Sequence, residues 1–211
     1  MEGLTPNDYL QSKISVIVSS SGEGGDEVQG TELDSHANMV VIGSQAFVFN
    51  HSGKFCEVKA FSEEANGMTN VPIVDAVIAY DCPYSMKTYI LVCRNTLCVP
   101  SMRHNLIPPF ILREAGLVVK DTPKIHCEDP GVEDHSIHDR ESGLRIPLSL
   151  RGIFSTFRTR PLTEREIDSI ETFPTIFLTP DSHAWDHYCD SYRLNEDAHL
   201  DFRGDMVYPP P

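Results

Sequence analysis

The stretch Leu33-Asp34-Ser35-His36-Ala37, followed by the apolar run Met39-Val40-Val41-Ile42-Gly43, decides the fold prediction for this chain. An apolar residue leads into Asp-Ser, and a β-branched run follows a short polar break. This pattern predicts two strands joined by a turn that carries Asp34. Asp and Ser form turns routinely, so the motif alone also fits a purely structural turn. A carboxylate displayed at a strand end is also a candidate catalytic acid or base.

Length and composition indicate a globular protein. The 211 residues suit one ordinary domain with tails, or two small domains. Apolar residues make up 40% of the chain and charged residues 23%. Seventeen basic and 31 acidic residues give a net charge of −14, which would repel a phosphate backbone. We therefore expect no nucleic-acid partner, whereas a basic peptide or protein remains possible.

The chain shows no targeting or membrane signal. Its first residues, Met1 to Asp8, lack the basic start and apolar core of a signal peptide. No stretch approaches the roughly 18 to 20 apolar residues of a membrane helix. The six cysteines form no C-x-x-C pair, which favours free thiols in a reducing compartment. We expect an intracellular, cytoplasmic protein without a cofactor and without a membrane partner.

The order of apolar runs and turn residues predicts a mainly β protein. Residues 1–30 are acidic and glycine-rich toward their end and are predicted to be a flexible linker. Short β-branched and aromatic runs follow, and one helix is predicted at Pro109–Ala115, ended by Gly116. A further β segment is predicted at 123–160, and a helix start at Thr163. The runs predicted as strands are 39–42, 46–49, 55–61, 73–79, 88–92, 117–120, 136–138 and 144–150, with turns at 50–53, 65–67, 81–83 and 140–143.

Several segments together resemble copia-type retrotransposon polyproteins. The Asp34 stretch resembles the active-site segment of their proteases. The run Leu97-Cys98-Val99-Pro100-Ser101-Met102-Arg103-His104-Asn105-Leu106-Ile107 resembles the "VP-x-x-x-x-N-L" turn that leads to a short helix, a glycine and a final strand. Segments 145–152, 157–161, 179–186, 195–197 and 200–204 resemble the spacer between protease and integrase. The resemblance covers roughly residues 31–205.

The resemblance implies a fold and an activity. Residues 31–122 would form a retropepsin-like closed β-barrel with one short helix. Residues 123–160 would be a β-rich extension, and 161–211 a spacer-like, loosely ordered helical tail. The activity implied is an aspartic endopeptidase that cuts its own polyprotein as a homodimer, with one catalytic Asp34 per chain. Ser35, His36 and Ala37 would support the active-site loop, and Ala65, Asn66 and Gly67 would form the tip of a mobile flap.

The sequence departs from the usual retropepsin pattern at two places. His36 stands where glycine usually follows Asp-Ser and allows unrestricted φ and ψ. Pro108-Pro109 stands where relatives usually carry Gly-Arg or a similar pair before the helix. These departures keep a second hypothesis open, a catalytically inactive, protease-like scaffold that dimerises or binds peptides.

Two other motifs are interpreted as coincidental. Asp181-Ser182-His183-Ala184 repeats the tetrapeptide, but its surroundings predict a helix start rather than a second active site. His126, Cys127, His135 and His138 are suitable zinc ligands whose spacing fits no familiar pattern. We therefore predict no metal site.

Overall fold

The structure is a computed structural model. It describes residues 30–59 and 67–180, the backbone of Ile14–Ser15, and the isolated positions 201, 203, 205 and 207. The repeat Asp181–Ala184 and the predicted flap residues Ala65 and Asn66 lie outside these residues. Among the described residues, no helix has the length and apolar character needed to cross a membrane.

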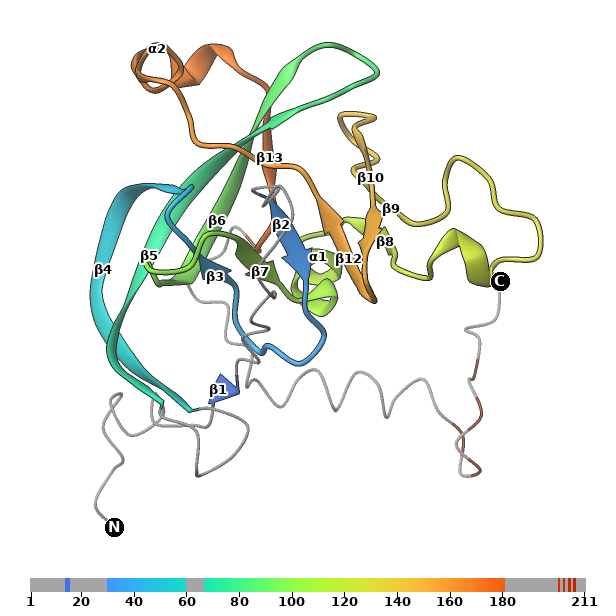
Figure 1. The fold of residues 1–211 in the computed structure, drawn as a ribbon, viewed down its shortest axis with the longest axis horizontal. Coiled ribbons are helices and arrows are strands. Elements are labelled where there is room, and N and C mark those ends of the chain that lie inside the picture. Colours follow the sequence, from blue (N-terminus) through green and yellow to red (C-terminus); the bar gives the residue numbers. More distant parts are fainter. Residues whose placement is uncertain are drawn as a thin grey trace.

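Most described strands join one large sheet (Figure 1). Long antiparallel pairings between β4 and β5 and between β5 and β6 form its centre. Within the described residues the order is β1-β4-β5-β6-β3-β7-β2-β12-β11, with β13 paired to β6. The strands are β1 (Ile14–Ser15), β2 (Thr31–Leu33), β3 (Val41–Ile42), β4 (Phe47–Lys59), β5 (Met68–Asp81), β6 (Thr88–Cys98), β7 (Asn105–Ile107), β11 (Ser149–Arg151), β12 (Phe154–Phe157) and β13 (Thr175–Phe177).

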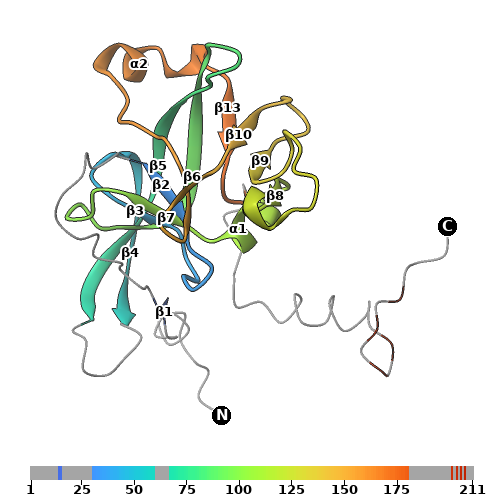
Figure 2. The same ribbon diagram turned by 45° about the vertical axis from the view of Figure 1, so that its right-hand side comes forward.

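A smaller sheet and short helices accompany the large sheet. The small sheet has the order β10-β9-β8 and consists of β8 (Val118–Lys120), β9 (Ser136–His138) and β10 (Arg145–Pro147). The helical elements are α1 (Pro109–Glu114), η2 (Lys124–His126), α2 (Glu164–Asp168) and η3 (Ile170–Thr172). Figure 2 shows α2 beside the β5–β6 turn, while the β4–β5 hairpin extends at the opposite end.

The strands around Asp34 are interleaved rather than sequential. β2 runs parallel to β7, from Thr31 opposite Asn105 to Leu33 opposite Ile107. On its other side β7 pairs antiparallel with β3, which in turn lies parallel to β6. β7 is therefore inserted between β2 and β3, although it follows them by more than 60 residues in the sequence. The turn that carries Asp34 passes from one side of β7 to the other.

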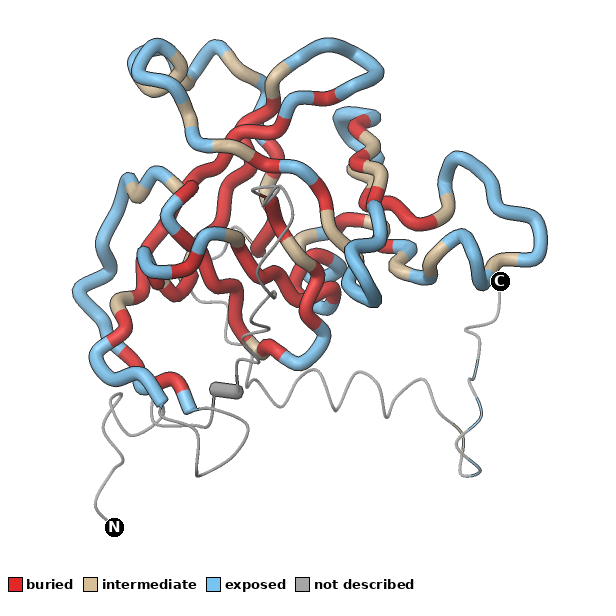
Figure 3. The backbone as a smooth tube through the Cα atoms, viewed as in Figure 1, coloured by how far each residue is buried: buried red, intermediate tan, exposed pale blue. Residues whose placement is uncertain are grey.

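The core lies on both faces of the central strands. One cluster joins β5 and β6 residues to α1, β8, β9 and β10, and includes Leu91, Leu112 and Ile137. A second cluster lies around Val41, Leu97 and Leu106. In Figure 3 these buried segments form the red interior, whereas most of β4 is exposed. The fully buried aliphatic side chains supply the main favourable free energy of folding.

Two expectations need correction. The predicted closure into a β-barrel is not found in the described residues, where β1 and β11 end the sheet path as edge strands. The predicted turn at 50–53 is also wrong, because β4 continues through it with register shifts against β5. Gly53 adopts φ 75° there, and Asn50 donates a hydrogen bond to Asp75 (2.8 Å). The extra residues are thus absorbed as bulges rather than as a reversal of the chain.

Other expectations are confirmed. The chain is mainly β, and α1 occupies the predicted helix, with Pro109 in its first turn and Gly116 at φ 88° just after its end. α2 begins after Thr163 with a capping box that includes Glu166.

The strands that follow β10 join the same large sheet. β12 pairs antiparallel with β2, and β13 pairs parallel with β6. The boundaries proposed near 122 and 160 remain predictions.

Candidate active site at the Asp34 turn

Asp34 lies at the end of β2, where pairing with β7 stops. Its backbone N–H donates to the Ile107 carbonyl at 3.1 Å, which continues the β2–β7 ladder by one residue. Ser35 and His36 form an exposed turn, and Ala37 returns to the interior with 6% exposure. The structure therefore brings the four predicted loop residues together in one tight turn at a strand end.

The two oxygens of the Asp34 carboxylate have different environments. Oδ1 accepts a hydrogen bond from the His36 backbone N–H at 2.9 Å, an Asx-type turn that fixes the orientation of the carboxylate. Oδ2 is buried, and it has no hydrogen-bond partner among the described residues. The side chain as a whole is only 9% exposed. A buried acceptor without a partner costs free energy, and Oδ2 is such an acceptor among the described residues.

His36 fits the turn without the backbone freedom of glycine. It is not among the residues with positive φ, so its conformation is open to any L-residue. Its side chain points outward and is 73% exposed, with Nδ1 3.9 Å from Asp34 Oδ1. The bulk that glycine would avoid is thus directed into solvent. When protonated, the imidazole places a positive charge next to the carboxylate.

A second carboxylate lies two residues from Asp34 on the same strand. Burial raises the pKa of Glu32, the nearby Asp34 charge raises it further, and Arg151 partly offsets both. Residues two apart on a strand lie on the same face. The two carboxyl groups at the end of β2 therefore lie near each other, with Arg151 close enough to offset part of their charge.

A buried polar network holds β2 against its neighbours. Asn105 is fully buried; its Oδ1 accepts from the Gly43 N–H at 2.9 Å, and its Nδ2 donates to Thr31 Oγ1 at 3.1 Å. Thr31 Oγ1 lies 2.9 Å from Thr159 Oγ1, which in turn donates to Gln45 Oε1 at 3.3 Å. One asparagine thus links β2, β7 and the residue after β3. This link positions the strand that carries Asp34.

Gly43 allows two backbones to approach closely at the end of β3. A Cβ at this position would lie 2.5 Å from the Met102 carbonyl oxygen and 2.8 Å from that of His104. The Ser44 N–H donates to the same Met102 carbonyl at 2.8 Å. Glycine is therefore required here by space rather than by φ.

The predicted flap is described only in part. Gly67 lies immediately before β5, and a Cβ there would lie 2.5 Å from the Val58 carbonyl oxygen. β4 and β5 do form the long hairpin that a flap needs. In Figures 1 and 2, the turn after β2 lies on the lower side of the view, and so do the last residues of β4 and the first residues of β5.

Sequence reasoning missed an ion-pair network elsewhere on the sheet. Arg160 donates to both Asp81 oxygens, at 2.6 and 2.9 Å, and to both Glu166 oxygens, at 2.8 and 2.7 Å. It thereby ties the end of β5 to the first turn of α2. Asp81 and Arg160 are 79 residues apart, and nothing in the local sequence pattern indicates their pairing.

The remaining candidate metal ligands are His126, Cys127, His135 and His138. No group of three or more metal-ligating side chains is found within the described part of the chain. His135 Nε2 instead lies 2.8 Å from Ser155 Oγ, in hydrogen-bonding distance. Cys56, Cys82, Cys93, Cys98 and Cys127 are free thiols.

Comparison with known proteins identifies no relative of this chain. No protein-family model, curated protein or solved structure matched this chain.

Proposed function

We propose that this protein is a retropepsin-like aspartic endopeptidase that acts as a homodimer, with one Asp34 from each chain. The observation that carries the proposal is the Asp34 carboxylate itself. It follows β2, a strand paired on both sides, one oxygen is fixed by the turn, and the other is buried without a described partner. A second copy of the same carboxylate would complete this arrangement by sharing a proton with Oδ2.

The order of elements after β6 supports the proposal. The resemblance implies a turn after Val99-Pro100, a strand at Asn105-Leu106, a short helix, a glycine and a final strand. The chain has β7, α1, Gly116 and β8 in that order. β7 also lies beside β2, so this segment supports the strand that carries the candidate catalytic residue.

The proposed chemistry is general acid–base catalysis by the Asp34 pair. Two carboxylates at about 3 Å cannot both ionise, so the pair holds one proton and titrates as a unit. The ionised Asp34 takes a proton from water as the water oxygen attacks the scissile carbonyl. The protonated Asp34 gives its proton to the carbonyl oxygen. The substrate proposed from the resemblance is a polyprotein of a copia-type element, and the β4–β5 hairpin would exclude water above it.

The second candidate is a catalytically inactive scaffold that dimerises or binds peptides. Two observations favour it: the low exposure of the Asp34 side chain, and the backbone hydrogen bond that already occupies Oδ1. An Asp in a structural turn needs nothing more. Catalysis requires the second chain and substrate to reach Oδ2.

A cleavage assay distinguishes the two candidate functions. The substrate is a peptide library derived from a whole proteome, and mass spectrometry identifies the peptide termini that cleavage creates. Wild type and Asp34→Asn are compared between pH 4 and 7. Asp129→Asn, a change in an exposed loop, is the matched control. The proposal expects cleavage by wild type and Asp129→Asn and none by Asp34→Asn. A folded, dimeric wild type that cleaves nothing would favour the scaffold.

A further inference from the structure

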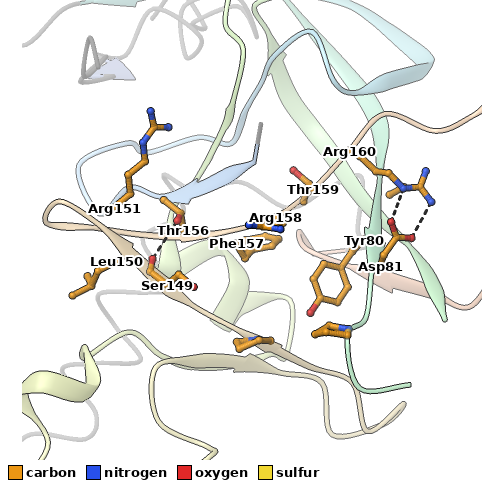
Figure 4. A pocket seen from close by; sticks show the side chains of 13 residues that line it. Tyr80, Asp81, Ser149, Leu150, Arg151, Thr156, Phe157, Arg158, Thr159 and Arg160 are labelled. Carbon is orange, nitrogen blue, oxygen red and sulfur yellow. Dashed lines mark hydrogen bonds and ion pairs between the residues drawn. The ribbon is translucent and has the colours of Figure 1, made fainter. Parts of the chain in front are cut away.

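A pocket of about 800 Å³ lies beside β11 and β12, and the residues of the Asp34 turn do not line it. Three segments surround it: the end of β5, the chain from Pro147 through β11, and residues 156–160 at the end of β12 and just after it (Figure 4). Its volume is in the range that ordinary small-molecule sites occupy. The proposed protease chemistry makes no use of it.

Tyr80 gives this pocket a polar group without a partner. The residue is 3% exposed, and its hydroxyl oxygen has no hydrogen-bond partner among the described residues. Its ring packs edge-to-face against Phe157, with centroids 6.3 Å apart and planes at 73°. In Figure 4 the hydroxyl points away from the backbone of β5 into the space between these segments. Buried hydroxyls are normally paired, so the Tyr80 hydroxyl is a hydrogen-bond donor that a ligand acceptor would satisfy.

The rest of the lining defines the kind of acceptor. Pro83, Pro147 and Phe157 provide apolar walls. Burial raises the pKa of the Tyr80 hydroxyl, which keeps it a donor at neutral pH. Arg158 lines the pocket, is exposed, and forms no ion pair with a described residue. Arg160, by contrast, is fully engaged by Asp81 and Glu166 and belongs to the wall.

We propose that this pocket binds an organic carboxylate with an apolar body, which accepts a hydrogen bond from Tyr80 and faces the cationic side chain of Arg158. A free small acid and the C-terminus of a peptide share this chemistry. A carboxylate satisfies the unpaired donor and pairs with the guanidinium, while the apolar body contacts the proline and phenylalanine walls. The proposal does not rest on the activity of Asp34.

Calorimetric titration of the full chain tests the proposal with defined probes. N-acetyl-leucine carries the carboxylate, and N-acetyl-leucinamide has the same body without the charge. We expect saturable binding of the acid and roughly tenfold weaker binding of the amide, because the amide lacks the charge-assisted hydrogen bond that the carboxylate forms. An acetylated tripeptide with a free C-terminal leucine distinguishes the two possible ligands. If the tripeptide binds more tightly than N-acetyl-leucine, the ligand is a peptide C-terminus. If the two bind equally, the ligand is a small acid.

Matched variants locate the binding site. Tyr80→Phe keeps the ring and removes the unpaired hydroxyl, so its Tm is expected to equal or exceed that of wild type while acid binding weakens. Arg158→Gln is expected to weaken acid binding as well. Tyr84→Phe and Arg140→Gln, at exposed positions outside the pocket, are the controls and should bind normally. Absence of saturable binding, equal binding of acid and amide, or binding unchanged by Tyr80→Phe or Arg158→Gln would each overturn the proposal.

Discussion

Asn105 shows how one buried side chain determines the geometry of the candidate site. It satisfies the Gly43 N–H and the Thr31 hydroxyl at once, in a place that water does not reach. Such a residue has a larger effect when removed than its own two hydrogen bonds suggest, because the buried Gly43 N–H is then left unpaired and Thr31 keeps only its contact with Thr159. The asparagine in the turn motif therefore has a structural explanation that is independent of catalysis.

Replacing Asn105 by alanine is expected to lower the free energy of unfolding by about 2 to 4 kcal/mol. The cause is the loss of two partners inside a buried network, together with a small cavity. Urea unfolding followed by circular dichroism measures the change. Thr122→Ala, at an exposed position, is the control and should remain within about 0.5 kcal/mol of wild type. Equal effects of the two substitutions would contradict the role given to Asn105.

Gly43→Ala is expected to destabilise the protein by about 1 to 3 kcal/mol, because its Cβ would overlap two carbonyl oxygens of the backbone. Gly131→Ala is the matched control. A Cβ at Gly131 would meet its nearest atom at 3.6 Å, and no positive φ is required there. Thermal unfolding of both variants tests the contrast, and a Gly43→Ala protein as stable as Gly131→Ala would refute it.

At the scale of elements, sequence patterns predict local structure well and strand length poorly. The helix at Pro109 and the capping box at Thr163 depend on neighbours in the sequence, and both are found. β4 is longer than predicted because the turn-forming residues around Gly53 stay within the strand. Bulges in the β4–β5 pairing accommodate them, and Asn50 donates a hydrogen bond to Asp75 on β5. Asp75 receives hydrogen bonds from Asn50 and from the Asn95 N–H, two long-range partners that local propensity does not reveal.

The link between β5 and α2 is expected to weaken in acid. The pKa of Glu166 is lowered to about 2, chiefly by hydrogen bonds from Arg160, and the same arginine is the main cause of the lowered pKa of Asp81. A carboxyl group whose pKa is lower in the folded state than in the unfolded state stabilises the folded protein. Its full contribution is present at pH values above the unfolded pKa, which is about 4.3 for Glu. This stabilisation is lost as the pH falls toward the folded value.

Comparison of wild type with Arg160→Gln isolates this effect. The difference in Tm between the two proteins is expected to be largest near pH 7 and to shrink between roughly pH 5 and pH 2. Thermal unfolding across that range measures it. Arg165→Gln, at a neighbouring exposed position in α2, should show a small difference that does not change with pH. A constant difference for Arg160→Gln would show that the ion pairs do not contribute.

At the scale of the whole molecule, the arrangement of strands determines where Asp34 lies. The turn motif predicts a strand end, but not that β7 lies between β2 and β3, or that β12 covers the other side of β2. These pairings join residues 60 to 130 positions apart. Non-local pairings depend on the whole chain and leave no local periodicity. The same limit applies to the Tyr80 pocket, whose three segments meet only in the folded protein.

The central claim is that two chains each contribute one Asp34 to a single active site. Its most direct test mixes wild type with an equal amount of Asp34→Asn, after co-refolding that lets the chains exchange, and measures cleavage of a peptide substrate. At constant total protein, random pairing leaves about one quarter of the dimers with two aspartates, so about one quarter of the wild-type activity is expected. Activity near one half would mean that each chain acts alone. Full activity, or a folded wild type that cleaves nothing, would contradict the proposed enzyme.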